Sequence, residues 1–159
     1  MIDTTSLGIV VDTNESLPQH CGYRFAGDRV MHLDCADYSA IGLIDTLRIE
    51  RKSLPDFLGC CGSRREAFER GTLAEMQVYT HRYLLIESSL RDIAAARWDR
   101  PRITASQAIG SLFAWQIDYG VRVILADDAP HARASVVRIV HLLLDRAKKA
   151  KKNAAEQRE

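Results

Sequence analysis

The chain has 159 residues, of which 47% are hydrophobic, and this length suffices for one domain whose core needs neither disulfides nor a structural metal. The formal net charge of +1 excludes a uniformly basic nucleic-acid binder, although basic residues cluster locally. Because the chain shows no amino-terminal signal pattern and no apolar run of about 18 residues, we expect an intracellular, soluble protein.

The first third of the chain predicts three strands. Residues 7–12 form a short apolar run that suits a buried strand, and residues 29–34 and 43–52 predict two more. These three strands are expected to form a meander.

Two helices are predicted to follow. Residues 54–60 predict a short helix, with Ser53 as its N-cap and Pro55 in its first turn. Residues 64–80 predict a longer helix in which Gly71 is a weak point. The side chains expected to face inward from this helix are Phe68, Met76 and Tyr79.

The second half alternates strands and helices. Residues 83–86 and 121–126 predict strands, and a loop or short helix is expected to run from the first of them to residue 102. That connection contains Trp98 and Pro101. Thr104 or Ser106 is expected to cap the next helix. The apolar face of this helix is expected to comprise Ile109, Leu112, Phe113 and Ile117.

A final helix is predicted from about Asp128. Its apolar positions cover more than half of its circumference, so either the sheet buries all of them or part of them forms a dimer interface. These positions are Val136, Val137, Ile139, Val140, Leu142, Leu143 and Leu144. The lysine-rich residues 148–159 are expected to be a disordered basic tail, which would be solvated or would raise affinity for DNA at low salt.

Charged residues near the end of the third predicted strand carry the chemistry. Alternate side chains of a strand share a face, so Glu50 and Lys52 project together and Arg51 projects oppositely. If Asp37 joins them from a neighbouring segment, the two carboxylates can hold a divalent cation while Lys52 reaches the same phosphate. The pair Glu50 and Lys52 taken alone also fits ordinary solvated charge. The cysteines and histidines show no zinc-ligand spacing, and we expect reduced thiols.

These residues resemble a family motif. Ala36-Asp37, then Glu50-Arg51-Lys52 and Asp56, are similar to the GD and ERKxxxD hallmark of XPF-type structure-specific endonucleases. The resemblance spans residues 7–144. Supporting segments are Val10-Val11-Asp12-Thr13-Asn14-Glu15, Arg64-Arg65-Glu66-Ala67-Phe68 and Tyr83-Leu84-Leu85-Ile86-Glu87.

The chain departs from the family pattern at two positions. Alanine occupies position 36 where the family has glycine, and a positive φ there would strain Ala36. Asn14 replaces the arginine of the opening motif, which leaves the role of the Asp12 and Glu15 cluster less defined than that of the ERK segment.

The resemblance implies an α/β fold with a restriction-endonuclease-like PD-(D/E)xK core, a central mixed sheet flanked by helices, over residues 1–147. It implies Mg²⁺- or Mn²⁺-dependent hydrolysis of DNA at branched or single-strand/duplex junctions, in repair or recombination, by a homodimer paired through its C-terminal helices. We expect no membrane partner. An inactive DNA-binding or dimerisation scaffold is the alternative. A nucleotide-binding domain is disfavoured because no Gly-rich loop follows the first strand.

The site residues follow from motif and resemblance together. The expected catalytic residues are Asp37, Glu50 and Lys52; the metal ligands are Asp37, Glu50, Asp12 and Glu15; the DNA-binding residues are Arg51, Arg64 and Arg65. Arg51 has a structural role as its alternative. Asp56 near a helix start is expected to cap the helix or to support the metal.

Overall fold

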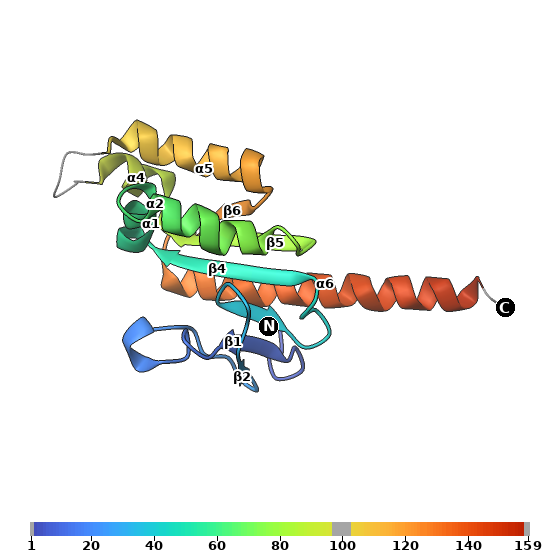
Figure 1. Cartoon of the computed structure of the whole chain (residues 1–159). Coiled ribbons are helices and arrows are strands. Elements are labelled where there is room, and N and C mark those ends of the chain that lie inside the picture. Colours follow the sequence, from blue (N-terminus) through green and yellow to red (C-terminus); the bar gives the residue numbers. More distant parts are fainter. Residues whose placement is uncertain (1, 97–102, 158–159) are drawn as a thin grey trace.

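The computed structural model describes residues 2–96 and 103–157, which form a mixed sheet with helices on both faces (Figure 1). The strands are β1 (Ile9–Asp12), β2 (Arg29–Met31), β3 (Tyr38–Ala40), β4 (Leu47–Ser53), β5 (His81–Glu87) and β6 (Arg122–Leu125). The helices are η1 (Pro18–His20), α1 (Leu54–Cys61), α2 (Arg65–Phe68), η2 (Glu69–Leu73), α3 (Ala74–Met76), α4 (Leu90–Ala95), α5 (Ala105–Tyr119) and α6 (Ala129–Glu156). The predicted α/β class is confirmed.

The sheet has six strands in the order β2-β1-β3-β4-β5-β6. β4, β5 and β6 are parallel, β3 is antiparallel to both β1 and β4, and β2 runs parallel to β1 at the edge. The predicted meander is therefore wrong. The missing element was β3, whose three residues are too few to show an alternating pattern.

The strand predicted over residues 43–52 is also too long. Residues 43–46 form a turn instead, in which the backbone N–H of Leu47 donates to the carbonyl of Leu43 at 2.8 Å. Gly42 enters this turn with φ of +83°. β4 consequently begins at Leu47, and its last residues reach the end of the sheet where the charged motif lies.

Each face of the sheet has its own core. One core packs the inward stripe of α6 against β1, β3 and the Leu47 and Ile49 side of β4. The other packs α1, α2, η2, α3 and α5 against Leu84 and Ile86 of β5. Figure 1 shows α5 and α6 on opposite sides of the sheet.

The predicted caps are confirmed where the structure describes them. The side-chain oxygen of Ser53 accepts the backbone N–H of Asp56 to start α1, and Pro55 occupies the first turn. Thr104 rather than Ser106 starts α5, through a capping box with Gln107. Asp128 starts α6. Trp98 and Pro101 lie outside the described residues.

The helix predicted over residues 64–80 is interrupted. It runs from Arg65 to Met76 as α2, the π turn η2 and α3, and Gly71 lies inside the π turn. A π turn holds one residue more than an α turn and is frequent near functional sites. Phe68, Met76 and Tyr79 are buried, as predicted.

The apolar face predicted for α5 is wrong in part. Phe113 and Ile117 are 59% and 81% exposed, whereas Trp115 is fully buried. The Trp115 ring packs edge-on against Phe57 and Phe68, with centroids 6.0 and 5.1 Å away. This packing turns Phe113 and Ile117 outward, because each is two residues from Trp115 and residues two apart on a helix do not share a face.

α6 extends beyond the sheet. Val136, Val137, Val140 and Leu143 are buried against the sheet, but Leu142 is 54% exposed. Residues 148–156, predicted to be disordered, instead continue the helix, which projects past the edge of the molecule (Figure 1). Among the described residues, no helix combines the length and apolar character needed to cross a membrane.

Candidate active site

The residue before Asp37, Ala36, has a strained backbone conformation. Ala36 has φ of +64°, a left-handed conformation that costs a non-glycine residue about 1 kcal/mol. This is the strain that the sequence predicted for alanine at this position. This conformation lets the backbone N–H of Asp37 donate to the Ile49 carbonyl at 3.0 Å, while its carbonyl accepts from Asp12 at 2.8 Å. Asp37 thus joins β1 to β4.

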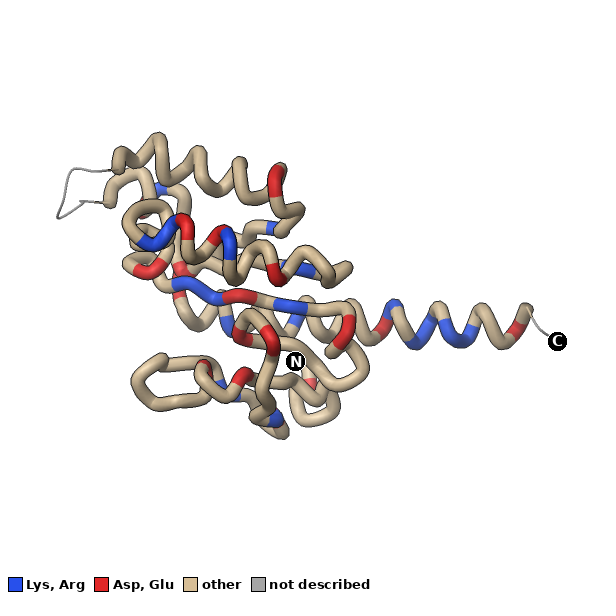
Figure 2. Tube along the Cα trace, in the orientation of Figure 1, with Lys and Arg blue, Asp and Glu red and all other residues tan. Residues whose placement is uncertain are grey.

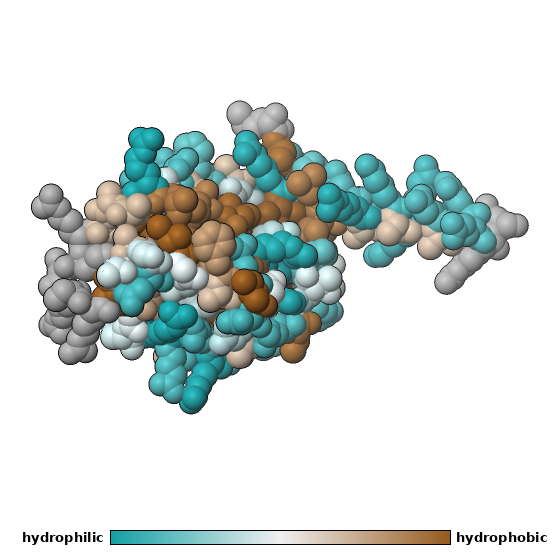
Figure 3. All heavy atoms as spheres, turned by 90° about the horizontal axis from the view of Figure 1, so that it is seen from above, coloured by the Kyte–Doolittle hydropathy of each residue, from teal (hydrophilic) through white to brown (hydrophobic). Residues whose placement is uncertain are grey.

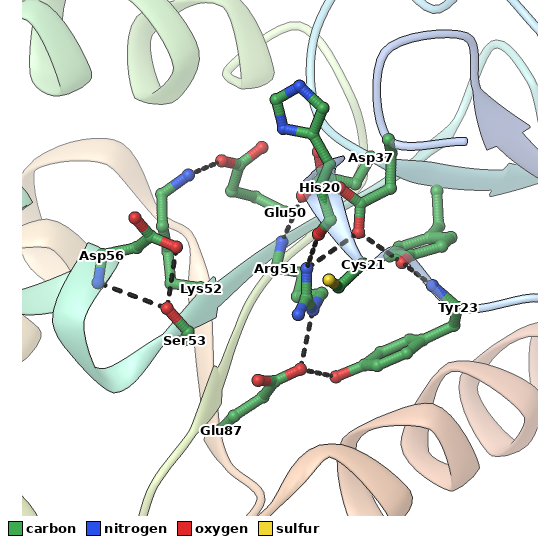
Figure 4. A network of polar contacts seen from close by, with 12 residues as sticks. His20, Cys21, Tyr23, Asp37, Glu50, Arg51, Lys52, Ser53, Asp56 and Glu87 are labelled. Carbon is green, nitrogen blue, oxygen red and sulfur yellow. Dashed lines mark hydrogen bonds and ion pairs between the residues drawn. The ribbon is translucent and has the colours of Figure 1, made fainter. Parts of the chain in front are cut away.

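The carboxylate of Asp37 lies against β4. Its Oδ2 accepts the backbone N–H of Arg51 at 2.6 Å. Glu50 and Lys52 flank that residue on one face of β4, and Lys52 Nζ donates to Glu50 Oε1 (Figure 4). The ring centre of Phe68 lies 5.1 Å from Lys52 Nζ. Figure 2 shows the alternating charges along β4.

Burial makes the charge of this cluster costly. Burial and the neighbouring carboxylates of Glu50 and Glu15 raise the pKa of Asp37 well above its usual range. Burial opposes the positive charge of Lys52, but the carboxylates of Glu50 and Asp37 outweigh it and raise the pKa of Lys52. The surroundings therefore favour the charged form of Lys52 and disfavour the ionised form of Asp37.

Arg51 projects from the opposite face of β4, where its side chain is 13% exposed. Its Nε donates to Glu87 Oε1 at 2.6 Å. Its Nη1 donates to Glu15 Oε1 at 3.1 Å and to the His20 carbonyl at 3.1 Å. The guanidinium lies 5.0 Å from the ring centre of Tyr23. These contacts fit the structural alternative for Arg51, and its predicted contact with DNA stays a prediction.

Two tyrosines close the contacts around Arg51 into a ring. Tyr38 Oη donates to Glu15 Oε1 at 2.6 Å and accepts the backbone N–H of Tyr23 at 2.8 Å. Tyr23 Oη donates to Glu87, and the two tyrosine rings stack 5.6 Å apart. We call Glu15, Arg51, Glu87, Tyr23 and Tyr38 the Arg51 network. Figure 4 labels Arg51, Glu87 and Tyr23 among them. The Arg51 network ties the turn after β1 and the loop before β2 to β3, β4 and β5.

Asp12 and Glu15, two of the four predicted metal ligands, have partners at both oxygens of Asp12 and at Oε1 of Glu15. Asp12 Oδ1 accepts the backbone N–H of Leu33 at 2.7 Å, and Oδ2 accepts that of Asn14 at 2.8 Å. Asp12 therefore holds the end of β1 to the end of β2. Glu15 belongs to the Arg51 network, in which its raised pKa results mainly from burial.

Asp37 and Glu50 remain as the acids beside Lys52. Within residues 2–96 and 103–157, no group of three or more His, Cys, Asp or Glu side chains is placed to hold a metal ion. Two carboxylates nevertheless suit Mg²⁺, which keeps several waters and takes other oxygens from a phosphate. A cation bound there would lower the raised pKa of Asp37, because a neighbouring positive charge favours the ionised carboxylate.

The remaining predicted residues surround α1 and α2. Asp56 receives a hydrogen bond from the Ser53 hydroxyl at 2.7 Å and pairs with Arg64 at 3.3 Å, which fits its capping role. Arg64 is half-exposed. Arg65 turns toward α5, where it pairs with Glu69 at 2.8 Å and donates to Ser111 at 2.9 Å. Of the three arginines predicted to bind DNA, Arg64 has the most exposed side chain, at 54% against 41% for Arg65 and 13% for Arg51.

Two solved structures share this arrangement of strands and helices. XPF from Aeropyrum pernix is 20% identical, with a TM-score of 0.64 over 91% of this chain and 68% of that chain. The chain has the XPF-type nuclease fold. XPF from Aeropyrum pernix in its complex with DNA is 22% identical, with a TM-score of 0.58 over 87% of this chain and 65% of that chain. No protein-family model and no curated protein matches the sequence.

The XPF-type fold confirms the resemblance and the restriction-endonuclease-like core at the level of architecture. The motif residues Asp37, Glu50 and Lys52 converge, and their catalytic and metal-binding roles stay predictions. Sequence reasoning missed Tyr23 entirely and gave Glu87 no role. A sequence signal for Glu87 existed, because the segment 83–87 that resembles the family ends in this acid. In the structure, the parallel pairing of β4 with β5 sets Glu87 opposite Ser53.

Proposed function

We propose that the protein is a Mg²⁺- or Mn²⁺-dependent DNA endonuclease. The observation that carries the proposal is the convergence of Asp37, Glu50 and protonated Lys52 at the end of β4, in an XPF-type fold. The solved relative in complex with DNA supports DNA as the substrate. Branched or junction DNA, processed in repair or recombination, is the substrate class that the motif resemblance favours.

The residues divide the chemistry between them. A bound divalent cation would supply charge neutralisation at the phosphate and a more acidic water, and Asp37 and Glu50 would hold it. Asp37 Oδ2 is fixed by the backbone of Arg51, which leaves Oδ1 for this purpose. Lys52 contributes a fixed positive charge that orients the attacking water or stabilises charge on the phosphate. Arg64, whose exposed side chain lies beside α1, would contact the DNA backbone.

The test is cleavage of end-labelled single-stranded, duplex, flap and fork DNA with Mg²⁺, Mn²⁺ or EDTA. We expect metal-dependent cutting that is lost in Asp37→Ala and Lys52→Ala. Asp45→Ala, at an exposed acid before β4, is the matched control and should cut normally. Undiminished cutting by Lys52→Ala would contradict the assignment. Binding without cutting on every substrate would favour the inactive scaffold. The ion pair between Glu50 and Lys52, and Asn14 in place of the family's arginine, also fit that alternative.

We also propose that the molecule forms a homodimer along β6. β6 is one of the two edge strands of the sheet, with α5 beside it on one face of the sheet and α6 on the other. Phe113 and Ile117 on α5 expose apolar surface. An apolar band crosses the molecule when it is viewed from the α5 side (Figure 3). An open strand edge with exposed apolar neighbours suits pairing with a second copy.

Light scattering after size exclusion tests the dimer. We expect the parent to be a dimer and Phe113→Lys/Ile117→Lys to be a monomer. Val78→Lys, at a position 80% exposed after α3, is the control and should stay dimeric. A parent that is monomeric at all concentrations would contradict the proposal.

A further inference from the structure

The C-terminal part of α6 is a projecting arm with a cationic face. We define residues 146–156 as the basic arm. Lys148, Lys149, Lys151 and Lys152 are all exposed, and Figure 1 shows this part of the helix projecting past the sheet. Lys151 and Lys152 follow Lys148 by three and four residues, so both lie near it on one helix face. The acid of the arm, Glu156, pairs with Lys152 at 3.7 Å.

The charge of the molecule is divided between the arm and the rest. Residues 1–145 contain 16 Lys and Arg against 19 Asp and Glu, whereas the arm contains five Lys and Arg against one Glu. The arm is therefore +4 on a body of −3, and Figure 2 shows its cations along the projecting helix. A polyanion approaching this protein meets a repulsive body and an attractive arm.

The opposite face of the arm limits what the lysines can bind. Ala147, Ala150 and Ala154 continue the sheet-facing stripe of α6 beyond Leu143. Helices that lie in a membrane surface bury large apolar residues such as leucine, phenylalanine or tryptophan on that face. Alanines supply little such area. The charge pattern therefore suits a hydrated, repeating polyanion better than a lipid surface.

The arm is far from the candidate active site. The site lies at the end of β4 where Lys52 is found, whereas the arm leaves the molecule at the other end of that strand (Figure 1). α6 has 28 residues, so its lysines lie about 30 Å along the helix from its start. One strand of B-DNA has a phosphate about every 3.4 Å, so this length corresponds to roughly nine base pairs.

We propose that the basic arm binds the phosphate backbone of duplex DNA about one helical turn away from the bond that is cut. The inference rests on the proposed nuclease function and adds a second contact to it. Lysine is suited to this role, because each ammonium group is a point charge on a flexible stem that follows a backbone without reading its bases. The arm would then set a minimum length of duplex beside the junction.

The test is fluorescence anisotropy of labelled DNA with the full chain in EDTA, across a series of salt concentrations. The variant changes Lys148, Lys149, Lys151 and Lys152 to glutamine, which keeps helix propensity. We expect binding to a long duplex to weaken at least about tenfold and the slope of log Kd against log salt to fall by about three. A hairpin with a stem of about six base pairs is too short to contact the active site and the arm at once, so we expect the arm variant to lose less affinity for it than for the long duplex.

The matched control removes four exposed cations elsewhere, as Arg29→Gln, Arg70→Gln, Arg91→Gln and Arg138→Gln. We expect it to lose much less affinity. Equal losses in both quadruple variants would show that only net charge matters, and unchanged binding by the arm variant would refute the contact. Arm-dependent binding to phosphatidylserine vesicles without arm-dependent binding to DNA would also overturn the proposal.

Failure of the nuclease proposal can be told apart from failure of the arm. Binding in EDTA requires no cleavage, so the arm effect should persist in the Asp37→Ala background. Arm-dependent binding with no cutting would reject the endonuclease and keep the arm. Cutting with no arm dependence would do the reverse.

Discussion

The two faces of β4 use the same residue types for different ends. Around Arg51, each charged group has at least one opposite charge or a tyrosine hydroxyl as partner. On the other face, Lys52 is the one cation beside the carboxylates of Asp37 and Glu50. Burial, together with the carboxylates of Glu50 and Glu15, raises the pKa of Asp37 there despite that lysine. The balanced cluster around Arg51 joins elements of the fold, whereas the unbalanced one is where we propose that a cation and a phosphate bind.

Among the substitutions on the two faces of β4, we expect the largest effect from replacing Lys52, and we expect it on the rate of cleavage. Lys52→Met removes the cation but keeps most of the stem that packs near Phe68. We expect the rate of DNA cleavage to fall by about 10²-fold or more, since a fixed charge at the phosphate is lost. Single-turnover cleavage assays give the rate, and circular dichroism should show that the variant is folded. A rate within a few fold of the parent would remove Lys52 from the chemistry.

Arg51 should behave in the opposite way. Arg51→Met leaves Glu15 and Glu87 buried without their cation, and we expect a loss of about 3 kcal/mol or more in the free energy of unfolding. Urea unfolding monitored by circular dichroism measures it. Arg64→Met is the control, because Arg64 and Asp56 are both 54% exposed, and it should cost below about 1 kcal/mol. Similar losses in both variants would contradict the special status of the Arg51 network.

The raised pKa of Asp37 predicts that the free energy of unfolding falls as pH rises above the ordinary aspartate range. The pKa of Asp37 is raised in the folded protein, so the folded state holds the proton more tightly than the unfolded state. In EDTA, stability from this group is fully present below the ordinary aspartate pKa and is lost as pH rises toward the raised one. Asp37→Asn should flatten this decline in urea unfolding measured at several pH values. An identical decline in the variant would assign it to other groups.

The smallest effect on stability is expected at Ala36, whose backbone is strained. Ala36→Gly removes the cost of a left-handed alanine but adds conformational entropy to the unfolded chain. We expect a net gain of up to about 1 kcal/mol in the free energy of unfolding, with cleavage unchanged. A loss of stability would mean that contacts of the Ala36 methyl group outweigh the strain.

Local sequence signals predicted much of the fold. Ser53, Thr104 and Asp128 mark helix starts because a capping side chain bonds only to neighbours in the chain. The alternation of Glu50, Arg51 and Lys52 is likewise a property of any strand. The family motif then predicted that Asp37 lies beside Glu50 and Lys52, and it predicted the central mixed sheet.

What the sequence did not predict depends on distant partners. β3 has three residues and exists because β1 and β4 pair with it on either side. The outward turn of Phe113 follows from the packing of Trp115 against α1 and α2. Tyr23 follows no motif, and it matters only because the loop before β2 carries it to Glu87.

The π turn η2 has a consequence for comparing this chain with its relatives. Such a turn is a helix that has gained one residue and kept its hydrogen bonds by widening. An alignment that forbids gaps inside helices would misplace every residue on one side of Gly71. A one-residue gap at residues 69–73 is therefore the expected mark of relatives that keep a regular helix there.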